Sequence, residues 1–398
     1  MNRNVLLLTL CQATMMTSVS LVLSSSALIG AQLSPGPELA TLPLAIQYLA
    51  TLLMLFPLAW CMQRLGARTT FVCSALAGAL GLFMAAAGIY LESFFLFAVS
   101  GLLIGIFNGA GQYYRFAAAD AVAIEHKSLA ISLTLSGGLL AALLGPNLAL
   151  WSRDALGPDF FASFLILAII ATSSALLAGA LRLPDQNSSE PSDKSSSRDS
   201  LSRASLLKNP GILIAILAAV GSYAVMNLLM SATPLAMMHC GFGFDDTAWV
   251  IQWHLVAMFA PSFFTGQLIQ RFGCIPVMLL GCMLSFGSIG IGILGVELIH
   301  FEAALVLLGL GWNLLYIGAS SLLVEHCHPT DSHRARALNN TLVFTGVTGA
   351  TLISGSLAST MSWAAINLYA ALPVLLIMVG LLLFRLQTRA CPSAIRAS

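Results

Sequence analysis

The sequence predicts an all-α membrane protein in which twelve transmembrane helices form two pseudo-symmetric halves of six helices each. The first observation is composition: 58% of the 398 residues are hydrophobic and only 8% are charged, whereas soluble domains carry about 25% charged residues. The second is the recurrence of long apolar stretches, and the third is a motif that occurs once in each half. No basic patch with interleaved aromatic residues occurs, so we expect the lipid bilayer, and not nucleic acid, as a partner.

Apolar stretches of about 20 residues define the predicted spans. The first stretch follows Arg3 and has the start of a signal peptide, but it continues to about Ile29 without a convincing cleavage site. We therefore expect it to be retained as a span. The twelve predicted spans are residues 5–30, 40–62, 70–90, 93–116, 128–151, 160–182, 210–235, 247–269, 274–296, 301–323, 338–360 and 364–386.

One connection between spans differs from the others in composition. Residues 184–208 are rich in serine and charge and contain almost no apolar residues, which is typical of a flexible linker. This segment predicts an N-terminal six-helix bundle at 1–183 and a C-terminal six-helix bundle at 209–398.

The distribution of charge predicts the orientation. If both termini lie in the cytoplasm, all seventeen Lys and Arg residues except Arg153 fall on the cytoplasmic side or at its interface. Such a bias is the positive-inside signal, and it places residues 184–208 in the cytoplasm. The loops expected outside contain Glu38, Glu92, Asp154, Asp159, Asp245, Asp246, Glu297 and Glu302.

The two halves repeat one another. Met62–Gly66 follows the second span, and the similar Ile269–Gly273 follows the eighth. Asn108 and Asp120 also have the same spacing as Asn313 and Glu325. Repeated six-span halves are typical of several families of membrane transporters.

These motifs resemble the major facilitator superfamily. The family signature between the second and third spans is Gly-x-x-x-Asp-Arg-x-Gly-Arg-Lys/Arg, and residues 59–68 and 266–274 are two copies with Gln63 and Gln270 in place of Asp. Gly145-Pro146 partly matches the antiporter signature of the family. Residues 114–120, 226–237 and 251–266 are similar to a bacterial branch that includes riboflavin uptake transporters.

The resemblance implies a monomeric, multi-pass protein of the bacterial inner membrane that moves a small molecule by alternating access, without a cofactor. It also implies a central cavity lined by the first, second, fourth and fifth spans of each half. Asn108, Gln112 and Arg115 share one helical face, and Trp312 and Tyr316 share another. The residues that we expect to bind substrate are Asn108, Gln112, Tyr113, Arg115, Asn227, Trp253, His254, Trp312, Asn313 and Tyr316.

Several of these residues have a structural alternative. The amides Asn227 and Asn313 can instead form hydrogen bonds between helices, and Trp312 can pack against neighbouring helices or lipid. His254 can be a hydrogen-bonded cavity residue and not a proton carrier, and Arg115 can extend to the cytoplasmic interface.

Charged residues at the cytoplasmic ends of the spans predict two gating clusters. One contains Asp120 with Arg64 or Arg68, and the other contains Glu325 with Arg271. We expect these pairs to form when the protein is open to the outside and to separate when it opens inward. The alternative is that they are solvated charges of little energetic value.

Other motifs are not expected to bind metal or nucleotide. The group His326, Cys327, His328 and His333 lacks ligand spacing typical of a metal site, and the Gly-x-Gly-x-x-Gly at 290–295 lies inside an apolar span without a preceding strand. No nucleophile–base pair suggests an enzyme. We therefore expect a transporter, with riboflavin uptake as the best interpretation and export of drugs or siderophores as the alternative.

Overall fold

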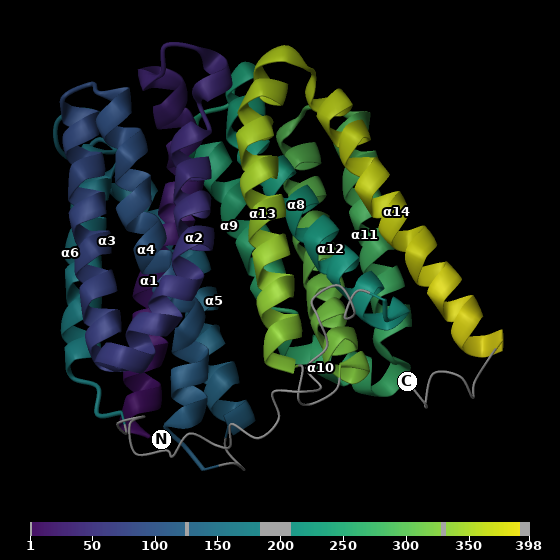
Figure 1. Cartoon of the computed structure of the whole chain (residues 1–398). Helices are drawn as coiled ribbons and strands as arrows, with labels where there is room; N and C mark the ends of the chain where they lie inside the picture. Colours follow the sequence, from purple (N-terminus) through teal and green to yellow (C-terminus); the bar gives the residue numbers. More distant parts are fainter. Residues whose placement is uncertain (1, 124–126, 184–207, 328–331, 391–398) are drawn as a thin grey trace. The chain divides into compact units, whose positions relative to one another are not determined.

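The computed structural model describes the chain except residues 1, 124–126, 184–207, 328–331 and 391–398 (Figure 1). The described residues form thirteen α-helices and one short 3-10 helix, without a strand. The elements are α1 (Arg3–Leu33), η1 (Pro37–Leu39), α2 (Leu42–Leu65), α3 (Ala67–Tyr90), α4 (Phe94–Asp120), α5 (Lys127–Ser152), α6 (Phe161–Gly179), α8 (Pro210–His239), α9 (Phe244–Phe259), α10 (Ser262–Phe272), α11 (Cys274–Leu294), α12 (Leu298–His326), α13 (Ser332–Thr360) and α14 (Trp363–Ala390).

These helices confirm the predicted all-α membrane fold. Ten helical segments of the described residues are long and apolar enough to cross a membrane. Eleven predicted spans each correspond to one helix, and the twelfth, 247–269, corresponds to α9 and α10 together. The helices are therefore consistent with the expected twelve spans.

The break between α9 and α10 was not predicted. It lies at Ala260–Pro261, where proline lacks the N–H group that a continuous helix requires. Proline alone does not explain it, because Pro57, Pro146 and Pro234 lie inside continuous helices. The contacts of this break are described with the candidate site below.

Packing divides the chain into two compact units, and each is described separately. Unit 1 contains Met1–Ser192, Ser231–Val256 and Thr351–Thr360, and unit 2 contains Asp193–Met230, Ala257–Ala350 and Met361–Ser398. The six-helix domains 1–183 and 209–398 stay a prediction, and most of the predicted linker 184–208 lies outside the described residues.

Small residues allow close packing in unit 1. There, α3 lies between α4 and α6, α2 packs on α4, and α1 packs on α5 (Figure 1). A side chain at Gly105 of α4 would place its Cβ 2.5 Å from the Gln47 carbonyl oxygen of α2. Instead, the Thr51 hydroxyl of α2 donates to the Gly105 carbonyl oxygen at 3.2 Å. Membrane helices commonly associate through small residues and interhelical hydrogen bonds, because lipid is as apolar as their side chains and no hydrophobic force draws the helices together.

Close packing of helices at small residues also occurs in unit 2. Here α11 packs against both α12 and α14, and α10 packs against α12. A Cβ atom at Gly311 of α12 would lie 2.9 Å from the Gly281 carbonyl oxygen of α11. Only glycine at this position lets the two backbones approach so closely.

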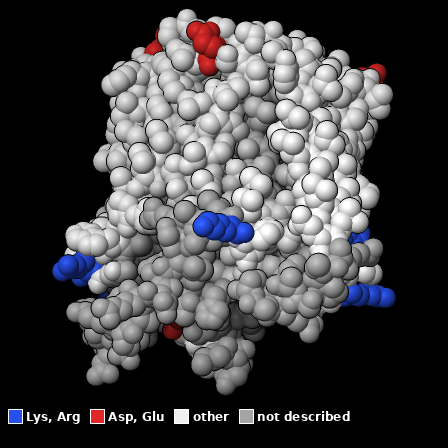
Figure 2. Space-filling view, turned by 45° about the vertical axis from the view of Figure 1, so that its right-hand side comes forward, with Lys and Arg blue, Asp and Glu red and all other residues white. Residues whose placement is uncertain are grey.

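Charged side chains are concentrated near the helix ends. Arg64 and Arg271 lie in the last turns of α2 and α10, and Asp245 and Asp246 lie in the first turn of α9. Figure 2 shows Lys, Arg, Asp and Glu only as a few separate side chains on a face that is otherwise without charge. The cytoplasmic location of the termini stays a prediction.

Candidate functional site

The polar face of α4 lies in unit 1. Asn108 is buried, and its Oδ1 atom has no hydrogen-bond partner among the described residues. Gln112 and Arg115 follow on the same helical face and are half-buried. Tyr113 points elsewhere and donates its hydroxyl to the Leu55 carbonyl oxygen of α2 at 2.6 Å. Of these four residues, Asn108 has the clearest unused capacity to bind a ligand.

Arg115 remains inside the helix, since α4 continues to Asp120. Its Cζ atom lies 4.9 Å from the centre of the Phe116 ring. Its buried Nε atom has no hydrogen-bond partner in the described part of the chain. Neither the anion-binding interpretation nor extension to the interface is tested by these contacts.

Two further predicted residues are neighbours on α9 but face different environments. His254 is fully buried in unit 1, whereas Trp253 is 38% exposed and its ring lies 5.7 Å from that of Trp249. One turn of α9 thus offers an aromatic surface on one side and a buried imidazole on the other.

An amide pair on α5 and α9 was not among the predicted site residues. Asn147 donates through Nδ2 to Gln252 Oε1 at 2.7 Å, and both residues belong to unit 1. The sequence marks both as polar residues in apolar helices but does not show that they meet.

An aromatic cluster lies in unit 2. The rings of Trp312 and Tyr316 on α12 are stacked, with centroids 5.0 Å apart and an interplanar angle of 11°. Tyr223 of α8 stands nearly perpendicular to both rings, at 5.1 Å from Trp312 and 5.2 Å from Tyr316. We call these three residues the aromatic corner. Asn227 is buried one helical turn after Tyr223 on α8.

Asn313 is the residue that spans the break between α9 and α10. It is fully buried, and its Nδ2 atom donates to the Met258 carbonyl oxygen at 2.7 Å and to the Ser262 hydroxyl at 2.7 Å. Its Oδ1 atom accepts a hydrogen bond from Thr265 at 2.6 Å. The break leaves carbonyl groups of the last turn of α9 without helical partners, and Asn313 satisfies one of them. These contacts favour the structural alternative for Asn313.

The predicted gating residues are exposed, and the expected pairs are not formed among the described residues. Within the described residues, no ion pair joins Asp120 to Arg64 or Arg68, or Glu325 to Arg271. The Arg64 and Arg271 guanidinium groups lie instead over the Trp60 and Phe272 rings, at 5.8 and 5.3 Å, and Glu325 accepts a long contact of 3.7 Å from Cys274 Sγ. A pairing expected in only one conformation stays a prediction.

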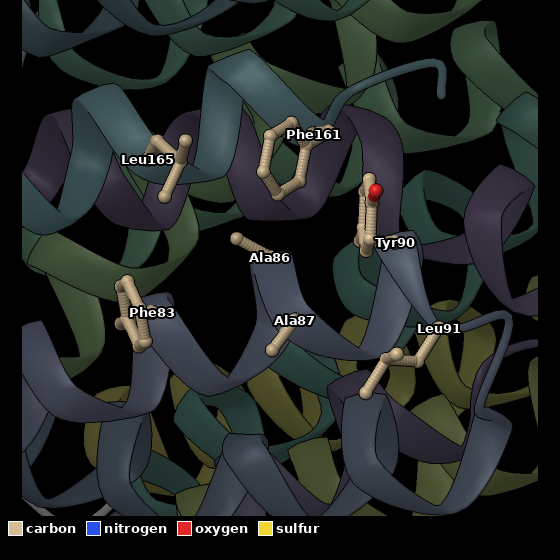
Figure 3. Close-up of a pocket in the computed structure, with 7 residues that line it drawn as sticks. All are labelled: Phe83, Ala86, Ala87, Tyr90, Leu91, Phe161 and Leu165. Atoms are coloured by element: carbon tan, nitrogen blue, oxygen red, sulfur yellow. The ribbon is translucent and has the colours of Figure 1, made fainter. Parts of the chain in front are cut away.

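A groove of about 250 Å³ lies on α3 and α6, and none of the predicted site residues lines it. Figure 3 shows its lining, which is almost entirely apolar. The groove therefore lacks the polar groups that would orient a metabolite. Its lining residues are Phe83, Ala86, Ala87, Tyr90, Leu91, Phe161 and Leu165.

The described chain contains no group of three or more His, Cys, Asp or Glu residues that could hold a metal.

Comparison with known proteins assigns the family. A sequence profile of the Major Facilitator Superfamily matches residues 6–346, which is most of the chain. The chain belongs to this superfamily. As a Major Facilitator Superfamily member with many apolar helices, it is a multi-pass membrane transporter.

Relatives within the Major Facilitator Superfamily support the assignment. The chain is 37% identical over 389 residues to "Riboflavin transporter RfnT" of Brucella anthropi, which covers 97% of this chain and 96% of that protein. It is 28% identical to "Uncharacterized MFS-type transporter YddS" of Bacillus subtilis, over 81% of this chain and 77% of that protein.

Solved structures confirm the superfamily fold. A D-xylose-proton symporter matches with a TM-score of 0.74 at 15% identity, covering 94% of this chain and 96% of that chain. The nucleoside transporter NupG matches with a TM-score of 0.72 at 14% identity, covering 96% and 98%. At these identities the similarity concerns the fold alone.

Proposed function

We propose that this transporter imports riboflavin across the bacterial inner membrane by alternating access, as a monomer with both termini in the cytoplasm. The observation that carries the proposal is the 37% identity to a named riboflavin transporter along nearly the whole length of both chains. The function for which the relative is named concerns that protein, so the site residues of this chain must supply the physical support.

The chemistry of the candidate residues suits this cargo. Riboflavin joins a planar ring system to a chain of hydroxyl groups. The aromatic corner of unit 2 offers ring faces, and the buried amide of Asn108 in unit 1 offers an unpaired acceptor for a hydroxyl or N–H group. A small set of polar groups among apolar ones is typical of small-molecule sites.

Growth of a riboflavin auxotroph tests the proposal. Cells expressing the full chain should grow on a limiting concentration of riboflavin that does not support cells with empty vector. A matched variant, Trp151→Phe, alters an exposed tryptophan outside the proposed site and should support equal growth. Absence of growth and of labelled riboflavin uptake, with normal amounts of protein in the membrane, would reject the cargo assignment.

The direction of transport is tested in the same cells. An importer should increase sensitivity to a toxic riboflavin analogue such as roseoflavin, whereas an exporter should protect the cells. The exporter alternative rests on Gly145-Pro146 in α5, and protection against unrelated drugs would support it. A reporter fused after residue 398 and active only in the cytoplasm tests the proposed orientation.

A further inference from the structure

The aromatic corner brings together three rings from two helices. Trp312 and Tyr316 form two parallel layers, and Tyr223 stands at 89° to the first and 83° to the second. Trp312 is buried, whereas Tyr223 and Tyr316 are half-buried. The corner is therefore most accessible on its tyrosine side, where a flat ring could pack against the Tyr223 and Tyr316 rings with its edge towards the Trp312 indole.

The corner also contains a polar atom without a partner. Trp312 is 7% exposed, and its buried Nε1 atom has no hydrogen bond among the described residues. Most buried polar groups in proteins are hydrogen-bonded, so an unpaired indole N–H near the middle of a membrane helix requires an explanation. Trp363 also has an unpaired Nε1 atom, but it lies at the first position of α14 and packs 5.2 Å from the Phe301 ring.

The ring faces and the N–H group select different chemical features. Aromatic faces attract planar π systems in offset-stacked or edge-to-face arrangements. The indole N–H is only a donor, so it requires an acceptor on the ligand. A planar heteroaromatic ring with a carbonyl oxygen or ring nitrogen at its edge provides both features, whereas a sugar or an aliphatic cation does not.

We propose that Tyr223, Trp312 and Tyr316 form a subsite for a planar heteroaromatic ring with a hydrogen-bond acceptor at its edge, and that Trp312 Nε1–H binds this acceptor. Tyr223, which lies on a different helix, limits the width of the ring. The proposal rests on the proposed function, because it identifies which part of the cargo unit 2 recognises. It assigns a specificity role to the indole N–H that is separate from stacking.

Direct binding to the purified full-length protein in lipid nanodiscs tests the subsite. The probes are riboflavin, lumiflavin, which has the ring without the hydroxylated chain, and ribitol, which has the chain without the ring. Flavin fluorescence is quenched when the ring stacks on tryptophan or tyrosine, so one titration gives both Kd and the quenched fraction. Trp312→Phe keeps a ring and removes the N–H, Tyr223→Ala removes one wall, and Trp363→Phe is the matched control.

Lumiflavin should bind with quenched fluorescence, and ribitol should not displace it. Trp312→Phe should weaken binding about tenfold, as expected for one lost hydrogen bond. Tyr223→Ala should reduce the quenched fraction, and Trp363→Phe should change neither quantity. If Trp312→Phe does not fold, Tyr223→Ala and the comparison of lumiflavin with ribitol still decide the question.

Two results would overturn the subsite. One is failure of the wild-type protein to bind lumiflavin, and the other is wild-type Kd and quenching in both Trp312→Phe and Tyr223→Ala. The proposed function fails separately: a protein that binds lumiflavin through Trp312 but does not move riboflavin into cells keeps the subsite and loses the transport assignment.

Discussion

A charged and aromatic cluster in unit 1 should hold the loop between α5 and α6 against the start of α9. Arg153 donates from Nε and Nη2 to Asp159 Oδ2, at 3.1 and 2.8 Å. Its Cζ atom also lies 5.6 Å from the Phe160 ring and 5.7 Å from the Phe244 ring, and these two rings pack edge to face at 4.7 Å. The Phe160 N–H closes the loop by donating to the Arg153 carbonyl oxygen at 2.9 Å.

The contacts of Arg153 set the free energy by which the cluster stabilises the closed loop. Hydrogen bonds to charged groups contribute about 1.5–3 kcal/mol, but the Arg153 and Asp159 side chains are 32% and 41% exposed, so solvent screening places this pair near the lower limit. Each cation–π contact adds about 0.5–1 kcal/mol when partly exposed. We therefore expect Arg153→Gln to reduce the free energy of local loop opening by about 2 kcal/mol.

Hydrogen exchange measured by mass spectrometry reports this opening. A change of about 1.4 kcal/mol corresponds to a tenfold change in an opening equilibrium, so exchange in residues 153–160 should be at least about tenfold faster in Arg153→Gln. Asp159→Asn should have a smaller effect, because the ring contacts of Arg153 remain. Adding Asp159→Asn to Arg153→Gln should change little, since the shared interaction is already lost.

Asp154 provides the matched control. Its carboxylate lies 3.4 Å from Arg153 but is 77% exposed, so Asp154→Asn should leave exchange near wild-type rates. Equal acceleration in Asp154→Asn and Asp159→Asn would refute the argument, because general loss of negative charge would then explain both. Full additivity of Arg153→Gln and Asp159→Asn would also contradict it.

Three further predictions concern other parts of the chain. Asn313→Ala should lower thermal stability in detergent, because it leaves the Met258 carbonyl oxygen unpaired at a cost of about 1–3 kcal/mol. Asn108→Ala should instead leave thermal stability unchanged and raise the KM of uptake. Asp120→Asn should slow turnover with unchanged substrate affinity if its gating pair forms in the outward-open state; unchanged turnover would support the solvated alternative. Deletion of residues 188–198, which are rich in serine and charge, should keep uptake near wild type, and loss of uptake by a variant present in the membrane would argue against a simple linker.

The helices could be predicted because the bilayer imposes a length on apolar segments. Every predicted span corresponds to helical structure, and most differ from the observed helices by only a few residues at each end. The break at Pro261 could not be predicted in the same way. Pro57 and Pro146 remain inside helices, so a proline does not by itself predict a break, and the sequence does not show that Asn313 of α12 reaches the Met258 carbonyl at this position.

The candidate site was predictable only where its residues share a helix. The spacing of four between Trp312 and Tyr316 predicts one face, and their rings are indeed stacked. Tyr223 was missed as a member of this group because it lies on another helix, and no local pattern shows that α8 brings it to Trp312. The pairing of Arg153 with an acidic residue is indicated by the sequence, since Arg153 is the single Lys or Arg residue in loops that are otherwise acidic.

The internal repeat shows how equivalent residues acquire different tasks. Asn108 and Asn313 have the same spacing to a terminal carboxylate in their halves, so the sequence gives no reason to distinguish them. Their surroundings do: the α9–α10 break supplies three partners to Asn313, whereas the Oδ1 atom of Asn108 has none within the described chain. An amide with all its groups engaged stabilises the fold but offers little to a ligand, and an amide with an unpaired acceptor offers the reverse. On the proposed function, the stacked rings next to Asn313 on α12 are therefore the groups in unit 2 that remain available to a ligand.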